Sequence, residues 1–238
     1  MLVAAALPAS AATVITRSGA PTFFDGGFAK TSFYSSWTQS AGNAYIAVTV
    51  AAEICSIGGV TTGTATAFLT NAIGPGTTVA NQIATAPVSV TGATACGTSS
   101  ALTTIFTGLS LPAGTYYLVF SNMNANFGWT QNIVAPTETL GTGVTSNVDA
   151  FETGGPGPYP PADVYTAYNI AGATKNFLFS VTGTLFVPPP PPPPTPTATG
   201  IPTLSTWGLF GMIILLGATG VLLTGKIPPQ DHDSLRPH

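Results

Sequence analysis

Residues 46–50 read Ile-Ala-Val-Thr-Val, and this short stretch decides the fold class. A large apolar residue alternates with a small or polar one, which is the period of two expected of a half-buried β-strand. The same alternation returns at Phe177, Phe179 and Val181. No stretch before residue 200 sustains the 3.6-residue period of an amphipathic helix. The body of the chain is therefore predicted to be all-β.

Turn signals divide the rest of the body into further short runs of β-forming residues. Pro112-Ala113-Gly114 separates two of these runs, and Ile73-Gly74-Pro75-Gly76 ends another. Strands are predicted at 65–69, 88–90, 102–111 and 115–120. Because the turns recur at the spacing typical of an antiparallel sandwich, we expect one β-sandwich domain over residues 13–187.

Two short segments carry a resemblance to a known class of domain. Residues 109–118, LSLPAGTYYL, resemble the penultimate hairpin of many bacterial secreted jelly-roll domains. Ser36-Trp37-Thr38, followed by the strand at 45–50, resembles the opening of those domains. The resemblance implies a jelly-roll-like antiparallel β-sandwich; Trp37 is expected in the core. It implies no activity, because one fold hosts many functions.

The C-terminal part has a different composition. Seven consecutive prolines, Pro188 to Pro194, open a Pro/Thr-rich segment over residues 188–200. Polyproline II extends about 3.1 Å per residue, so this segment is predicted to be an extended stalk. Residues 204–224 are long enough to cross a bilayer as a helix, and the part from 208 to 223 carries no charge. Lys226 follows, as on a cytoplasmic flank. The alternative for the apolar run is a buried core helix.

A short motif precedes this apolar run. Its residues are Ile201, Pro202, Thr203, Leu204, Trp207 and Gly208. Residues 201–226 therefore resemble the IPTL-CTERM protein-sorting domain, whose motif stands before one transmembrane helix and a basic end. The resemblance implies processing by an exosortase, a membrane-embedded cysteine transpeptidase of Gram-negative bacteria. Residues 227–238 would then be a cytoplasmic tail, although Lys226 and Arg236 replace the family's tight basic cluster.

The N-terminal residues 1–12 are similar to the second half of a secretory signal peptide. Pro8 ends an apolar run, and Ala9-Ser10-Ala11 fits the small-x-small cleavage rule. No Lys or Arg precedes Arg17, so we expect a start codon further upstream. The alternative is a disordered Ala-rich terminus. The mature protein is expected to begin at Ala12 or close to it.

The composition of the chain limits the classes of binding partner that can be expected. Charged residues make up 5% of the chain and the formal net charge is −3, so no basic patch favours nucleic acid. A membrane, the exosortase and an extracellular polysaccharide are the expected partners, and no cofactor is expected. The protein is expected to be exported, to pass through an inner-membrane intermediate, and to reach the cell surface or the extracellular matrix of a Gram-negative bacterium.

The chain has two cysteines, Cys55 and Cys96. An even pair in an exported protein indicates a disulfide, here predicted between two strands or between a strand and a loop. Closing a loop of about 40 residues stabilises a fold by roughly 4 kcal/mol in the chain-entropy model. The alternative is a pair of buried thiols.

The body offers little catalytic chemistry. Both histidines, His232 and His238, lie beyond the apolar run, so the body has no histidine for a triad, a dyad or a metal site. The pairs Asp149–Glu152 and Glu152–Asp163 are candidates for a glycosidase dyad. The body's acids are also candidates for a calcium site: Asp25, Glu53, Glu138, Asp149, Glu152 and Asp163.

Aromatic residues in predicted loops could bind a glycan by stacking. Trp129, Tyr159 and Tyr165 are the candidates. We therefore expect a non-enzymatic exported surface or matrix protein with a structural or adhesive role. The alternatives are a surface-anchored carbohydrate-binding module and a hydrolase.

Overall fold

The computed structural model describes residues 11–26, 32–58, 62–91, 96, 100–134, 136–154, 157–169, 172 and 174–187. The chain divides into two units, 1–188 and 189–238, and all the described residues lie in the first. The expected stalk, sorting motif, transmembrane helix and tail at 188–238 lie outside the described residues, as does the N-terminal segment 1–10. Within the described residues, no helix has the length and apolar character needed to cross a membrane.

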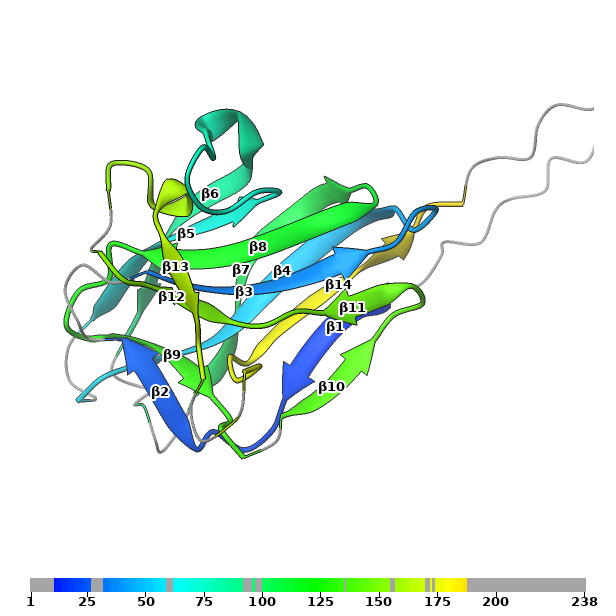
Figure 1. Cartoon of the computed structure of the whole chain (residues 1–238). Helices are drawn as coiled ribbons and strands as arrows, with labels where there is room; N and C mark the ends of the chain where they lie inside the picture. The colour runs from blue at the N-terminus through cyan, green and yellow to red at the C-terminus, as the bar shows by residue number, and fades with distance from the viewer. Residues whose placement is uncertain are drawn as a thin grey trace, which may run out of the picture. The chain divides into compact units, whose positions relative to one another are not determined.

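The described body is a sandwich of two antiparallel sheets, which confirms the all-β expectation (Figure 1). The first sheet, sheet A, has the order β10-β1-β14-β4-β9-β2, and β7 also pairs with β4. Its strands are β1 (Ala12–Ser18), β2 (Phe23–Gly26), β4 (Tyr45–Ser56), β7 (Ala101–Leu111), β9 (Phe127–Gln131), β10 (Thr137–Leu140) and β14 (Phe179–Leu185).

The second sheet, sheet B, has the order β13-β12-β3-β8-β5-β6, and β11 also pairs with β3. Its strands are β3 (Phe33–Gln39), β5 (Gly63–Thr70), β6 (Gln82–Val90), β8 (Gly114–Ser121), β11 (Val144–Ser146), β12 (Ala150–Glu152) and β13 (Tyr165–Ala167). The helical turns of the described chain are the 3-10 turns η1 (Val79–Asn81) and η3 (Pro160–Ala162).

Alternation along β4 and β3 builds the core between the sheets. Val48 and Val50 of β4 are fully buried, as the pattern at 46–50 predicted, and so is Ile54. Ile46 is 40% exposed, because the pairing of β4 with β7 shifts register between Tyr45 and Val48. Trp37 of β3 is fully buried too, and its ring lies 5.9 Å from that of Phe179 in sheet A. Burial of a large aromatic side chain is among the strongest contributions to such a core. The sandwich is therefore held by side chains from both sheets.

The runs at 102–111 and 115–120 form strands, but the expectation of a hairpin between them is wrong. β7 pairs with β4 in sheet A, whereas β8 pairs with β3 and β5 in sheet B. The turn after Leu111 carries the chain from one sheet to the other. Leu111 and Tyr116, on its two sides, are both buried in the shared core. The Tyr116 hydroxyl donates a hydrogen bond back to the carbonyl of Pro112 and fixes this turn.

Candidate functional site

A group of polar side chains surrounds the buried Arg17 of β1. Arg17 is only 1% exposed, although it is a charged residue. Its Nη1 donates to Asp149 Oδ1 at 2.5 Å and to Ser35 Oγ at 3.0 Å. Ser35 belongs to β3 of sheet B, so the guanidinium group spans the space between the sheets. A buried charge needs such pairing, since its desolvation is otherwise very costly.

The other two guanidinium nitrogens are also satisfied. Nε donates to Glu138 Oε1 of β10 at 2.8 Å. Nη2 donates to Ser146 Oγ of β11 and to the carbonyl of Asn147, both at 2.6 Å. The Arg17 Cζ lies 5.2 Å from the centre of the Phe179 ring, which adds a cation–π contact. Arg17 therefore joins β1 to β3, β10, β11 and the chain that follows β11.

Asp149 is the main anionic partner and is fully buried. Its Oδ1 accepts from Arg17 and, at 2.7 Å, from the Ser35 hydroxyl. Its Oδ2 accepts from the backbone N–H groups of Asn176 at 2.6 Å and Phe177 at 2.9 Å. Both carboxylate oxygens are thus engaged by donors of the protein itself. This arrangement orders three segments of chain and leaves no open position for a substrate.

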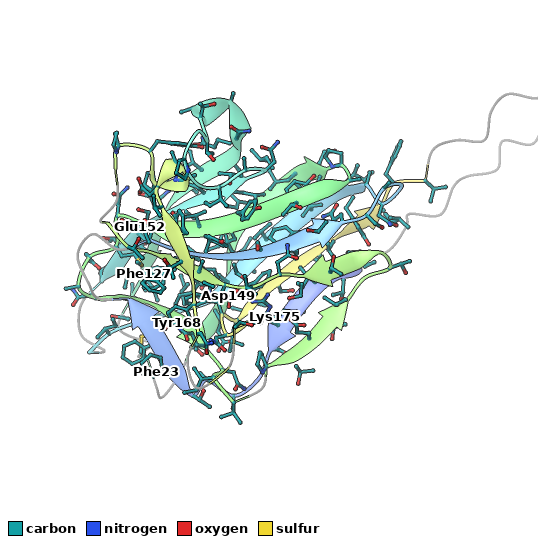
Figure 2. All side chains as sticks on the ribbon, in the orientation of Figure 1. Phe23, Phe127, Asp149, Glu152, Tyr168 and Lys175 are labelled. Atoms are coloured by element: carbon teal, nitrogen blue, oxygen red, sulfur yellow. A yellow bond between two sulfur atoms is a disulfide. The ribbon has the colours of Figure 1, made fainter. Side chains whose placement is uncertain are left out.

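The cluster reaches the surface at Glu138 and Lys175. The side chain of Glu138 is 24% exposed and that of Lys175 is 38% exposed, and Lys175 Nζ lies 3.8 Å from Glu138 Oε2. Pro136, Glu138, Thr174 and Lys175 line an open depression of about 320 Å³. Asp149, which binds Arg17 of β1, and Lys175, which lies next to Glu138 of β10, are labelled in Figure 2. The depression lies over the Arg17 cluster, whose buried charged groups already bind one another.

The structure gives the glycosidase alternative little support. Asp149 forms a buried ion pair with Arg17. Glu152 is buried and accepts from the backbone N–H of Gly154 at 2.9 Å. Both oxygens of Asp163 accept from the N–H of Gly157, at 3.1 and 3.0 Å. These three acids thus have local structural partners rather than a shared cleft.

The calcium alternative has no cluster of acids to support it. The described part of the chain contains no group of three or more His, Cys, Asp or Glu side chains that could hold a metal. Glu53 accepts a hydrogen bond from Ser100 next to β7, far along the chain from the acids of the Arg17 cluster. The side chain of Asp25 lies outside the description.

The predicted Cys55–Cys96 disulfide is confirmed, and it joins a strand to a turn. Cys55 is fully buried at the end of β4, and its Cα lies 4.9 Å from the Cα of Cys96. The Cys96 N–H donates to the carbonyl of Ser56 at 3.1 Å. A Cβ on Gly128 would lie 2.8 Å from the Cys96 sulfur, so β9 packs against the disulfide only because this residue is glycine.

The expectation that Trp129 is an exposed loop residue is wrong. Trp129 lies in β9 and is 0% exposed. Its ring stacks on Phe177 at 4.2 Å, and its Nε1 donates to the carbonyl of Leu178 at 3.0 Å. β9 lies between β4 and β2, and all five of its residues are buried, so this tryptophan is part of the core.

Tyr159 and Tyr165 are both half-buried. The loop prediction for Tyr165 is wrong, because this residue opens strand β13 of sheet B. Tyr165 packs edge-on against Tyr34 of β3 at 4.9 Å, and Tyr34 packs in the same way on Tyr117 of β8 at 5.4 Å. We call Tyr34, Tyr117 and Tyr165 the tyrosine surface. Burial raises the pKa of Tyr34 to about 12, with smaller contributions from the neighbouring Tyr117 and from Asp149. All three phenols are therefore neutral at physiological pH.

Sequence reasoning missed Tyr34 and Tyr117. In β3 the residues Phe33, Ser35 and Trp37 face the core, so Tyr34 must point to the other side of the sheet. The same alternation places Tyr117 opposite Tyr116 and Leu118 in β8. Period-two reasoning could have found both residues. The ring of Tyr159 packs edge-on against Phe68 of β5 at 6.0 Å.

No protein-family model, curated protein or solved structure matches this chain.

Proposed function

We propose that the chain is an exported, non-enzymatic surface or matrix protein that is sorted through its C-terminal segment. The order of the C-terminal features carries the proposal: a polyproline run, the motif at 201–208, an uncharged apolar run, and Lys226. An exosortase-type transpeptidase would cut near Ile201–Leu204. The stalk would hold a jelly-roll-like sandwich away from the bilayer, and one transmembrane helix would anchor the precursor.

Three features of the described body support this proposal. The disulfide suits an oxidising compartment outside the cytoplasm. β1 begins at Ala12, so cleavage after Ala11 would leave the first strand whole. β14 ends at Leu185, just before Pro188, so release of the C-terminal segment would leave the last strand whole.

The closed Arg17 cluster supports a non-enzymatic role. Catalysis needs an acid, base or nucleophile within reach of a substrate. Here the buried carboxylate of Asp149 is saturated by Arg17, Ser35 and two backbone N–H groups. Its evident contribution is to hold strands together.

Substitutions in the motif test the sorting proposal. Pro202→Ala and Thr203→Ala should leave export intact and block processing, because Pro202 keeps Ile201 extended for an active site. Thr206→Ala changes a neighbouring threonine outside the motif and serves as the matched control. Immunoblots of membrane and medium fractions should show a longer, membrane-bound form for the two motif variants alone. If all three variants match the wild type in size and partition, the proposal fails.

A surface-anchored carbohydrate-binding module is the second candidate, and the tyrosine surface is the observation that favours it. Tyr34, Tyr117 and Tyr165 present half-buried rings from three strands of sheet B. Rings of this kind combine an apolar face with a polar hydroxyl. The expected partner is an uncharged extracellular polysaccharide.

Affinity electrophoresis with neutral polysaccharides tests this second candidate. Tyr117→Ala should abolish retardation, whereas Tyr117→Phe should keep it because the ring remains. Phe23→Ala, at an exposed aromatic residue of β2 in sheet A, is the control. Equal migration of all variants in every polysaccharide would rule out the tyrosine surface.

A further inference from the structure

Strand β7 is an unusually long and unprotected sheet edge. It spans eleven residues, and among the described strands it pairs only with β4. Its sequence, ALTTIFTGLSL, contains no charged residue and no proline. Leu102 is 58% exposed, and Thr104, Thr107 and Ser110 are exposed as well. A long uncharged edge of this kind is a template for pairing with another chain.

The other edges of the two sheets carry the devices that discourage such pairing. β6 contains the exposed Pro87, which has no N–H to donate. β13 has three residues, and β2 has four residues including Asp25. β10 has four residues and carries Glu138. Short strands, prolines and charges all discourage edge-to-edge contact, and β7 has none of them.

Both ends of β7 are fixed to the body. The Cys55–Cys96 disulfide and the hydrogen bond from Ser100 to Glu53 hold the chain just before the strand. The hydrogen bond from Tyr116 to Pro112 holds the turn just after it. The edge is thus ordered before it meets a partner, which lowers the entropic cost of association.

The first part of β7 is its regular part. Ala101 to Thr104 pair in continuous register with Ile54 to Ala51 of β4. Register shifts follow further along, and Gly108 has a φ of 71°. Bulges of this kind twist an edge away from a flat pairing geometry. The surface open to a partner is therefore centred on Leu102 and Thr104.

We propose that β7 is a self-association edge, at which a second copy of this chain adds its own β7 antiparallel across a two-fold axis. In such an interface the same patch must complement itself. The absence of charge in β7 means that no like charges face each other across the axis. In an antiparallel pairing centred between Leu102 and Thr104, Leu102 lies opposite the partner's Thr104. The inference does not depend on the sorting route.

Sedimentation velocity of the full chain in non-ionic detergent tests this proposal. The wild type should show a concentration-dependent dimer. Thr104→Lys should weaken dimerisation by at least about tenfold, since each lysine would lie opposite the partner's Leu102 and the two lysines would be diagonal neighbours across the axis. Thr139→Lys places the same change at an exposed residue of β10, on the opposite edge of sheet A, and should dimerise like the wild type.

Two further measurements keep the test decisive. Both lysine variants should keep the wild-type unfolding midpoint, and Leu102→Lys replaces Thr104→Lys if the latter does not. Hydrogen exchange should show that the β7 amides gain protection as the wild-type concentration rises. A wild type that stays monomeric, or a folded β7 lysine variant that dimerises as tightly as the wild type, would overturn the proposal. The second result would place association elsewhere, for example in the apolar C-terminal run.

Discussion

The two sides of sheet A are held together by different chemistry. On the β1–β10 side, Arg17 binds Asp149 and Glu138 and connects both sheets through non-covalent contacts. On the β7 side, the Cys55–Cys96 disulfide closes the end of β4, and β7 itself carries no charge. The β1–β10 side thus contains many of the few charged residues of the body, whereas the β7 side has a covalent link.

The buried ion pair and the disulfide contribute to stability in different ways. A buried ion pair contributes little net stability over a well-packed apolar replacement, but the loss of one partner leaves an uncompensated buried charge. A disulfide acts mainly on the unfolded chain, by limiting its conformations. The first side should therefore be sensitive to single substitutions, and the second to redox conditions.

The largest expected effect is on the Arg17 side. Asp149→Ala should lower the free energy of unfolding by about 4 to 5 kcal/mol, because it strands Arg17 without its buried counter-charge and two backbone N–H groups without an acceptor. Urea denaturation measures this loss. Asp149→Asn keeps an acceptor and should cost less. A loss below about 1 kcal/mol for Asp149→Ala would mean that the cluster does not brace the sandwich.

Removal of the disulfide should have the next largest effect. The paired cysteines are 41 residues apart, and the replacement of both by serine should cost roughly 3 to 4 kcal/mol in the chain-entropy model. Urea denaturation of the oxidised, reduced and double-serine proteins measures it. The reduced wild type and the double variant should agree with each other. An unchanged midpoint after reduction would contradict the assignment of stability to this link.

A smaller effect is expected at the rim of the cluster. Glu138→Gln should lower the free energy of unfolding by about 1 kcal/mol or less. Glu138 is partly exposed to solvent, and Arg17 still has Asp149 as its buried counter-charge. Added salt should narrow the difference between variant and wild type, since screening weakens exposed pairs more than buried ones. A cost as large as that of Asp149→Ala would show that Glu138 is as essential as Asp149.

The last effect is expected only at high pH, next to β7. Burial raises the pKa of Tyr116 to about 12, and its hydroxyl donates to Pro112 only while protonated. The unfolded phenol ionises near its ordinary pKa of 10. The stabilisation is therefore complete below pH 10 and is lost as the pH rises towards 12.

Ultraviolet titration of the phenols, together with tryptophan fluorescence, follows this transition. Tyr116→Phe should remove one of the late-ionising phenols and reduce the loss of stability between pH 10 and pH 12. Ionisation of every tyrosine near pH 10 in the folded protein would contradict the burial of Tyr116.

The strand pattern explains which features could be predicted from the sequence. Alternation at 46–50 predicted β4, and the even cysteine count predicted the disulfide. The turn at 112–114 showed that a strand ends there, but a local turn signal does not say which sheet the next strand enters. The hairpin prediction therefore failed.

Two residues of the interior escaped prediction for related reasons. All five residues of β9 are buried, so period-two alternation could not show whether Trp129 faces the core or solvent. Arg17 follows Val14 and Ile15 in a strand, but its partners come from Asp149 and Glu138, more than a hundred residues away. Such a long-range pairing has no local sequence signal.

The intact mass of the mature protein, isolated from the cell surface or the medium, tests the proposed function most directly. The sorting proposal predicts a chain that begins near Ala12, ends near Ile201–Leu204, and has two hydrogens fewer than its reduced form because of the disulfide. In cells without the sorting enzyme, the mass should include the tail through His238. A mature protein that retains residues 205–238 in cells with the enzyme would contradict the proposal.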